Sequence, residues 1–201
     1  MAVTREGIHA ALSGVRDDIA EYIPDRQLTR IEPVECPGLS RYGIYSVNHL
    51  SPYKPILHYI GYAEGERAFV LDEDPEAFLA MAAVDNVSLN SAAEAAKYGA
   101  AFVTVTRPLT RLTYVVESIG DVRFRPKLSD AEQERRNAFE KQYGDSIAPP
   151  AAERERSGYR VVLYLVVEQE LRRITLHVTG AGAVDADAAV LETGLPLVAG
   201  I

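Results

Sequence analysis

Two long β-strands near the C-terminus constrain the fold of this chain more than any other feature of its sequence. Residues 159–168 and 171–179 are rich in valine, leucine, isoleucine and tyrosine, and only two residues separate them. A connection this short joins antiparallel strands. In the first strand residues 161–167 are all apolar, without the alternation of a strand that has one face in water. We therefore expect a central strand in which Val161, Leu163, Leu165 and Val167 form one buried face and the opposite face is at least partly buried.

The segments that flank this strand pair complete the expected architecture. Gly180-Ala181-Gly182 predicts a turn into a third strand over 183–191. Ser129 and Glu132 have the spacing of a capping box that opens a helix over 130–143. Elsewhere the predicted strands and helices lack the regular alternation of a parallel α/β sheet. The sequence thus predicts an α+β fold, with long antiparallel strands and a C-terminal helix-plus-meander packed against about four helices. This order would suit a cystatin-like or nuclear-transport-factor-like wrapped sheet, a comparison of architecture alone.

The first two thirds of the chain contain the other predicted elements. Helical spacing of apolar residues predicts an amphipathic helix that begins after Thr4, ends before Pro24 and buries Ile8, Leu12, Val15 and Ile19. Further helices are expected over 75–85 and 92–98, the latter closed by Gly99. Strands are expected over 41–47, 55–63, 67–71, 101–106, 112–118 and 121–125, and an exposed loop over 145–157.

Length and charge limit the classes of function. A chain of 201 residues suits a single domain over 1–201, with possible sub-lobes 1–99 and 100–201. The formal net charge is −8, whereas nucleic acids and anionic membranes select for clustered Lys and Arg. We expect neither nucleic acid nor a membrane as the main partner. The sequence makes no prediction of the oligomeric state.

The single cysteine, Cys36, cannot form an internal disulfide, so the fold should not depend on oxidation. The N-terminal residues do not have the pattern of a signal peptide. Both observations favour a cytoplasmic protein, and the abundance of Ala, Val and Arg has a bacterial character. Cys36 is expected on a loop between Pro33 and Pro37, and replacing it with Ser should preserve fold and activity.

Motifs for common cofactors and nucleophiles are missing from the sequence. It contains no phosphate-binding loop and no Gly-x-Ser-x-Gly elbow. Its four histidines and one cysteine do not have the short spacing of a zinc site, and Asp72-Glu73-Asp74 does not have the spacing of a calcium loop. We expect no metal and no cofactor.

One segment stands out by composition. Residues 42–62 contain five of the eleven tyrosines and two of the four histidines. Such side chains combine an apolar body with a polar tip, which suits a ligand pocket or a partner surface. In the predicted strand His58 and Tyr62 should share one face with Ile56 and Ile60. We name Tyr53, His58 and Tyr62 as candidate binding residues. The alternative interpretation is that tyrosines are frequent here because they suit β-strands.

His177 is the fourth candidate, on the same strand face as Thr175 and Thr179. If that face lined the concave side of a curved sheet, His177 would point into a cavity. If the face were open to water, His177 would be an ordinary polar residue of an alternating strand.

Two functions remain compatible with the sequence. The first is a non-catalytic protein that binds a small molecule or a protein partner through the tyrosine-rich segment. The second is a small enzyme that performs acid–base chemistry in a cavity, with His58 or His177 as the base and a tyrosine as the orienting group. The first is preferred, because no residues have the spacing that a catalytic motif requires.

Overall fold

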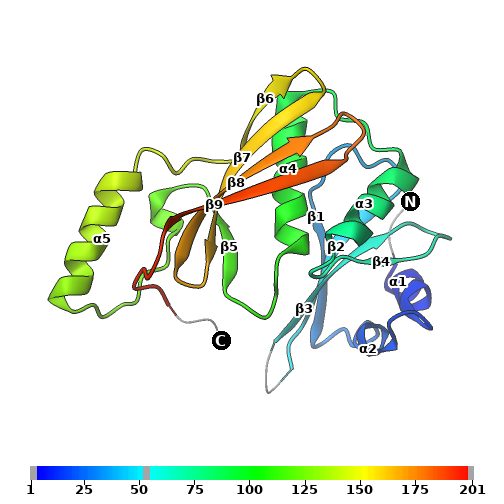
Figure 1. Ribbon diagram of the computed structural model, residues 1–201. Coiled ribbons are helices and arrows are strands. Elements are labelled where there is room, and N and C mark those ends of the chain that lie inside the picture. Colours follow the sequence, from blue (N-terminus) through cyan, green and yellow to red (C-terminus); the bar gives the residue numbers. More distant parts are fainter. Residues whose placement is uncertain (1–3, 52–54, 199–201) are drawn as a thin grey trace.

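The computed structural model describes residues 4–51 and 55–198 as helices, strands and connecting segments (Figure 1). In chain order the elements are α1 (Arg5–Leu12), α2 (Asp17–Ala20), β1 (Thr29–Val34), β2 (Gly43–His49), β3 (Ile56–Tyr62), β4 (Phe69–Val70), α3 (Pro75–Asp85), α4 (Ala92–Thr106), β5 (Thr113–Val116), the 3-10 turn η1 (Ile119–Asp121), α5 (Asp130–Tyr143), β6 (Ala151–Glu155), β7 (Gly158–Val167), β8 (Glu170–Val178) and β9 (Val184–Glu192).

The strands form two antiparallel sheets, and the fold is α+β as predicted. The N-terminal sheet has the order β1-β2-β3-β4, and the C-terminal sheet has the order β5-β7-β8-β9 with β6 also paired to β7. Among the described residues neither sheet is closed or curled (Figure 1). The wrapped sheet expected from the helix-plus-meander order is therefore wrong. The meander β7-β8-β9 forms, but the helix before it, α5, lies beyond the end of the sheet instead of under a curled face.

Hydrophobic clusters hold the layers together. Helices α1 and α2 cover one face of the N-terminal sheet, where Ile8, Leu12 and Ile19 pack against Val47 and Ile60. The largest cluster combines the opposite face of that sheet with α3, α4 and the inner face of the C-terminal sheet. A smaller cluster around Phe139 attaches α5 to the end of the C-terminal sheet. A division into 1–99 and 100–201 would cut through the middle of α4.

Strand β7 is central, which confirms the prediction from its apolar run. It pairs with β5 and β6 on one side and with β8 on the other. Val161 and Leu163 are fully buried on the inner face, and Val166 is fully buried on the outer face.

Helix α4 corrects the largest error in the expected secondary structure. Gly99 does not end a helix, and residues 101–106 are not a strand, because one helix runs through both. A Cβ atom at position 99 would stand 2.9 Å from Leu176 Cδ1 and 3.1 Å from Val161 Cγ1. Gly99 thus allows the helix to approach the C-terminal sheet closely. Burial of Val103 and Val105 in the core outweighs their preference for strands.

Three further expectations are wrong. The predicted N-terminal helix is two helices, because Gly14 adopts a positive φ of 83° between them, and Val15 is 62% exposed. The predicted strand over 121–125 is η1 followed by a single bridge between Phe124 and Leu197. The predicted loop over 145–157 contains β6. Charged residues are tolerated in this strand because it is at an edge of the sheet and its side chains are exposed to water.

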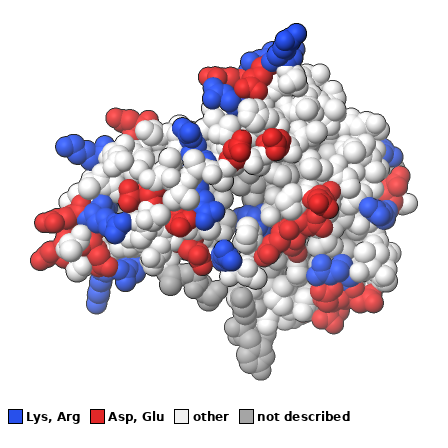
Figure 2. Space-filling model, in the orientation of Figure 1, with Lys and Arg blue, Asp and Glu red and all other residues white. Residues whose placement is uncertain are grey.

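Across the described ranges, no helix has both the length and the apolar character needed to cross a membrane. On the face drawn in Figure 2, Lys and Arg side chains are interspersed with Asp and Glu and form no continuous basic patch.

Candidate functional site

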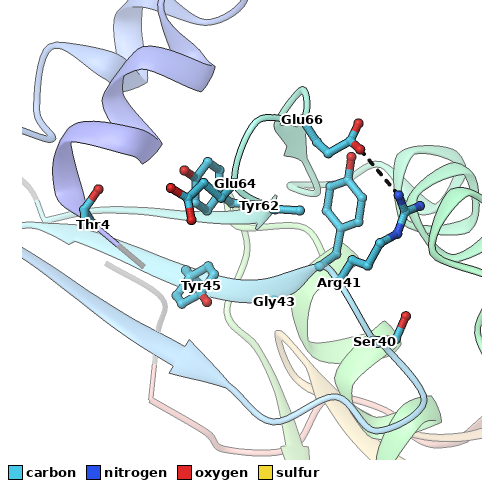
Figure 3. A pocket seen from close by; sticks show the side chains of 10 residues that line it. Thr4, Ser40, Arg41, Gly43, Tyr45, Tyr62, Glu64 and Glu66 are labelled. Carbon is cyan, nitrogen blue, oxygen red and sulfur yellow. Dashed lines mark hydrogen bonds and ion pairs between the residues drawn. The ribbon is translucent and has the colours of Figure 1, made fainter. Parts of the chain in front are cut away.

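A cavity of about 500 Å³ lies where β2 begins, β3 ends and α1 starts (Figure 3). This volume is in the range of small-molecule sites. Three tyrosines, Tyr42, Tyr45 and Tyr62, contribute to its wall. We call it the tyrosine cavity. Its remaining lining residues are Thr4, Ser40, Arg41, Gly43, Ala63, Glu64 and Glu66.

Two glycines allow the tyrosine rings to reach their positions. Gly43 and Tyr45 lie on the same face of β2, and a Cβ atom at position 43 would come within 2.5 Å of the Tyr45 hydroxyl and 2.9 Å of its ring. The hydroxyl end of the Tyr45 ring therefore lies against the bare backbone of Gly43. Similarly, a Cβ atom at Gly7 of α1 would overlap the Tyr62 hydroxyl. Larger side chains at either position would force a tyrosine to move.

The hydroxyl of Tyr62 opens to the cavity. Tyr62 as a whole is only 4% exposed. Its hydroxyl makes no hydrogen bond within the described part of the chain and is not among the buried polar atoms that lack a partner. Burial raises the pKa of Tyr62, and the nearby Glu64 carboxylate raises it further. Burial, followed by the proximity of Tyr62, raises the pKa of Tyr45. Both phenols are therefore neutral at physiological pH and are available as donors and acceptors.

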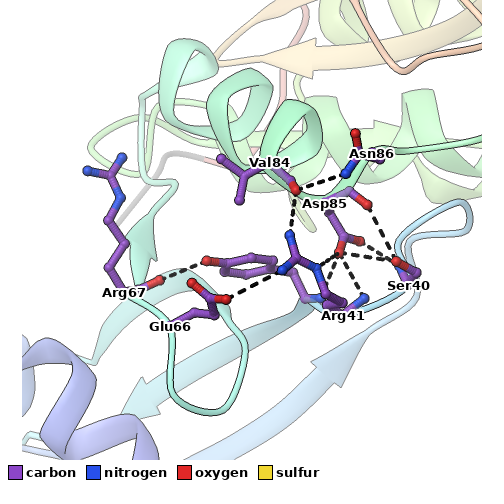
Figure 4. A network of polar contacts seen from close by, with 8 residues as sticks. Ser40, Arg41, Glu66, Arg67, Val84, Asp85 and Asn86 are labelled. Atoms are coloured by element: carbon purple, nitrogen blue, oxygen red, sulfur yellow. Dashed lines mark hydrogen bonds and ion pairs between the residues drawn. The ribbon is translucent and has the colours of Figure 1, made fainter.

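A buried carboxylate fixes the loop that leads into β2 (Figure 4). Asp85, at the end of α3, is 2% exposed and accepts hydrogen bonds from the backbone N–H groups of Ser40 at 2.5 Å and Arg41 at 2.8 Å. The Arg41 guanidinium lies 3.5 Å from the same carboxylate and donates to the Val84 carbonyl at 2.5 Å. These contacts set the position at which the chain enters Gly43 and hence one wall of the cavity.

The rim of the cavity is acidic. It carries the carboxylates of Glu64 and Glu66 and the guanidinium of Arg41. Arg41 pairs with Glu66 at 3.4 Å, in addition to its contacts with α3. Glu64 has neither an ion pair nor a hydrogen bond to any residue that the structure describes.

His58 is on the predicted strand face but outside the tyrosine cavity. The register places His58 opposite Val47, Ile60 opposite Tyr45, and Tyr62 opposite Gly43, so these β3 residues share one face. Four residues of strand separate His58 from Tyr62 by about 13 Å. His58 Nδ1 lies 2.5 Å from Asp72 Oδ2, and the other oxygen of Asp72 accepts the Tyr59 N–H at 2.5 Å. The pair fastens β3 to the segment before α3.

His177 lies on the outer face of the C-terminal sheet. Its side chain is 45% exposed, and Nδ1 lies 3.1 Å from a carboxylate oxygen of Glu155 on the edge strand β6, on the other side of β7. It is separated from His58 by the helical layer of α4. The two histidines therefore do not share a pocket.

Of the three candidates that the structure describes, His58, Tyr62 and His177, only Tyr62 lines the tyrosine cavity. Tyr53 lies outside the described residues. Sequence reasoning marked the tyrosine-rich segment but missed the contributions of Gly7, Glu64 and Arg41, which come from other parts of the chain. One local signal was present in Gly43-Ile44-Tyr45, because a glycine two residues before an aromatic in a strand allows the ring to cover the backbone.

Cys36 and the acidic residues show no sign of a reactive or metal-binding site. Cys36 is partly buried against the main core, and burial raises the pKa of its thiol to about 12. The thiol is therefore protonated at physiological pH, unlike a nucleophilic cysteine. Among the residues that the structure describes, no three His, Cys, Asp or Glu side chains gather as ligands of one metal ion.

Comparison with known proteins adds no further constraint, since no family model, curated protein or solved structure matches this chain.

Proposed function

We propose that this chain is a non-catalytic small-molecule-binding protein of the cytoplasm and that the tyrosine cavity is its binding site. The observation that carries the proposal is the Tyr62 hydroxyl, which opens to the cavity and has no hydrogen-bond partner among the described residues. A ligand that enters the cavity can replace the water at this hydroxyl with a hydrogen bond of its own.

The shape of the site favours a small molecule over a protein partner. Protein interfaces are typically broad surfaces with aromatic anchors, whereas Tyr45 and Tyr62 line a concave space of about 500 Å³. The walls are also anchored before any ligand arrives. Tyr42 packs edge-on against Phe69, and Asp85 holds the loop at Ser40 and Arg41. Preformed walls reduce the ordering cost of binding.

A ligand screen with matched variants tests the proposal. Cationic, neutral and anionic metabolite-sized compounds are screened by saturation-transfer NMR, and affinities of the hits are measured by calorimetry. Tyr62→Phe removes only the hydroxyl and should weaken binding by about two- to tenfold, the range of one hydrogen bond. Tyr164→Phe, on the outer face of the C-terminal sheet, is the matched control and should leave affinity unchanged.

The unfolding midpoint of Tyr62→Phe should remain close to that of the unmodified protein, because the hydroxyl makes no hydrogen bond to any residue that the structure describes. Two outcomes contradict the proposal. One is a screen without any hit in the three charge classes. The other is a set of hits whose affinities respond to Tyr164→Phe and not to Tyr62→Phe.

The second candidate function is the acid–base enzyme considered from the sequence. Its support is the 2.5 Å contact between His58 and Asp72, since a carboxylate at one ring nitrogen orients a histidine that acts as a base at the other. Both side chains are mostly buried, with 17% and 14% exposure. His58 does not line the tyrosine cavity, so the binding function proposed for that cavity does not depend on this pair.

A further inference from the structure

We infer that the ligand of the tyrosine cavity is a small organic cation that carries an alkylated ammonium group. This inference rests on the proposed function and adds the chemical class of the ligand. Three observations support it: the negative charge of the rim, the contacts that already engage the Arg41 guanidinium, and the tyrosines of the wall.

The rim has an excess of negative charge that the protein does not neutralise. Glu64 has no ion-pair or hydrogen-bond partner in the part of the chain that the structure describes, and it comes close enough to Tyr62 to raise the pKa of that phenol. Figure 3 shows the two side chains together at the end of β3, next to the start of α1. A cation in the cavity would gain an attraction to Glu64, whereas an anion would be repelled.

The guanidinium that the described rim carries is already engaged by groups of the protein. Arg41 is held by the Val84 carbonyl at 2.5 Å, by Asp85 at 3.5 Å and by Glu66 at 3.4 Å. Figure 4 shows the guanidinium directed toward the end of α3 by these contacts. Swinging Arg41 into the cavity would break all three and would leave the buried carboxylate of Asp85 without its charged neighbour.

The aromatic wall suits an ammonium group better than other cations. The faces of tyrosine rings attract cations placed within about 6 Å of the ring centre, and alkylated ammonium ions lose little hydration when they bind there. Tyr45 contacts Gly43 through the hydroxyl end of its ring and lines the cavity together with Tyr42 and Tyr62. The Tyr62 hydroxyl, which has no hydrogen-bond partner among residues 4–51 and 55–198, can also accept a hydrogen bond from a hydroxyl or N–H group of the ligand.

Paired probes that differ only in charge test this inference. Tetramethylammonium, choline and benzyltrimethylammonium are compared by calorimetry with the neutral isosteres in which carbon replaces nitrogen. At least one cation should bind about tenfold or more tightly than its isostere. Its affinity should fall as the salt concentration rises.

Matched variants test whether the carboxylate of Glu64 is the charge that attracts the cation. Glu64→Gln should weaken binding of the cation by about three- to tenfold and leave the neutral isostere unchanged. Glu134→Gln removes an equal charge from the exposed surface of α5 and should have no effect on either probe. Both substitutions are on the surface, so the folded state should be retained.

The outcomes separate this inference from the proposed function. If no cation binds more tightly than its isostere, or if Glu64→Gln and Glu134→Gln act alike, the ligand class is wrong. The proposed function survives that result if neutral or anionic compounds bind in a way that Tyr62→Phe weakens. If no compound of any class binds, both proposals fail.

Discussion

The Tyr62 hydroxyl lies so close to Gly7 that a Cβ atom at position 7 would overlap it. This contact couples the first turn of α1 to the end of β3 and sets the depth at which the phenol lines the tyrosine cavity. Because Gly7 is inside a helix, alanine there is favourable for the helix itself. Position 7 can therefore change the cavity without weakening the helix.

We predict that Gly7→Ala displaces the Tyr62 ring and weakens ligand binding by about fivefold or more, while helix propensity offsets part of the steric cost. Calorimetry on the best ligand of the screen measures the affinity. The double variant Gly7→Ala with Tyr62→Phe is the control. Because phenylalanine lacks the overlapping oxygen, the double variant should bind as Tyr62→Phe does. If Gly7→Ala has the full affinity of the unmodified protein, Tyr62 does not contact the ligand.

Asp85 should be among the most sensitive positions for stability. Its buried carboxylate accepts two short backbone hydrogen bonds, from Ser40 and Arg41. In Asp85→Ala these two part-buried donors lose their partner and the buried side-chain volume is emptied, which should cost about 2–4 kcal/mol of unfolding free energy. The thermal midpoint should fall by roughly 5–15 °C. Glu66→Gln removes only the exposed pair with Arg41 and should change stability by less than about 1 kcal/mol. Equal midpoints for the two variants would show that Asp85 does not hold the loop.

Cys36 should make stability depend on pH in the alkaline range. Burial raises the pKa of the folded thiol to about 12, whereas the unfolded thiol titrates near about 8.5. The protonated thiol therefore makes its full contribution to the free energy of unfolding at pH values below the unfolded pKa. That contribution is lost as the pH rises toward the folded pKa. Between about pH 8 and about pH 10 the unmodified protein should lose about 2 kcal/mol more unfolding free energy than Cys36→Ala. Denaturant titrations at the two pH values measure this difference, and parallel losses in both proteins would contradict the assigned burial.

His58 and His177 should respond differently to replacement. His58→Ala removes a mostly buried partner of Asp72 and should lower the unfolding free energy by about 1–2 kcal/mol. His177→Ala removes a side chain that is 45% exposed and should change it by no more than about 0.5 kcal/mol. Neither variant should alter ligand affinity. Loss of ligand binding or turnover in His58→Ala at an unchanged midpoint would favour the acid–base enzyme.

The sequence predicts much of the C-terminal sheet because its signals are local. The apolar run in β7 identifies a central strand, and the glycines after β8 identify the turn into β9. Local signals fail where packing decides the structure. Gly99 resembles a helix terminator in the sequence, but it provides close packing of α4 against Val161 and Leu176.

The candidate site is less predictable than the fold because it combines distant segments. The tyrosine-rich composition locates one wall, including Tyr62. It does not indicate that Gly7 lies against that tyrosine or that Asp85 holds Arg41 from about forty residues away. The same composition also suggested His58. It lies on the same strand face as Tyr62 but too far along the strand to line the tyrosine cavity. Alternation in a strand predicts the face of a side chain, not which residues of that face border a cavity.

The most direct test of the account is to map ligand binding on the protein by NMR. A two-dimensional ¹H–¹⁵N spectrum of the labelled protein is recorded during titration with the tightest ligand from the screen. The account predicts that the largest shift changes occur at the cavity wall, at Gly7, Gly43, Tyr45, Tyr62 and Glu64, with little change at His177 and its neighbours on β8. Shift changes centred on the outer face of the C-terminal sheet, with the resonances of Tyr45 and Tyr62 unmoved, would contradict it.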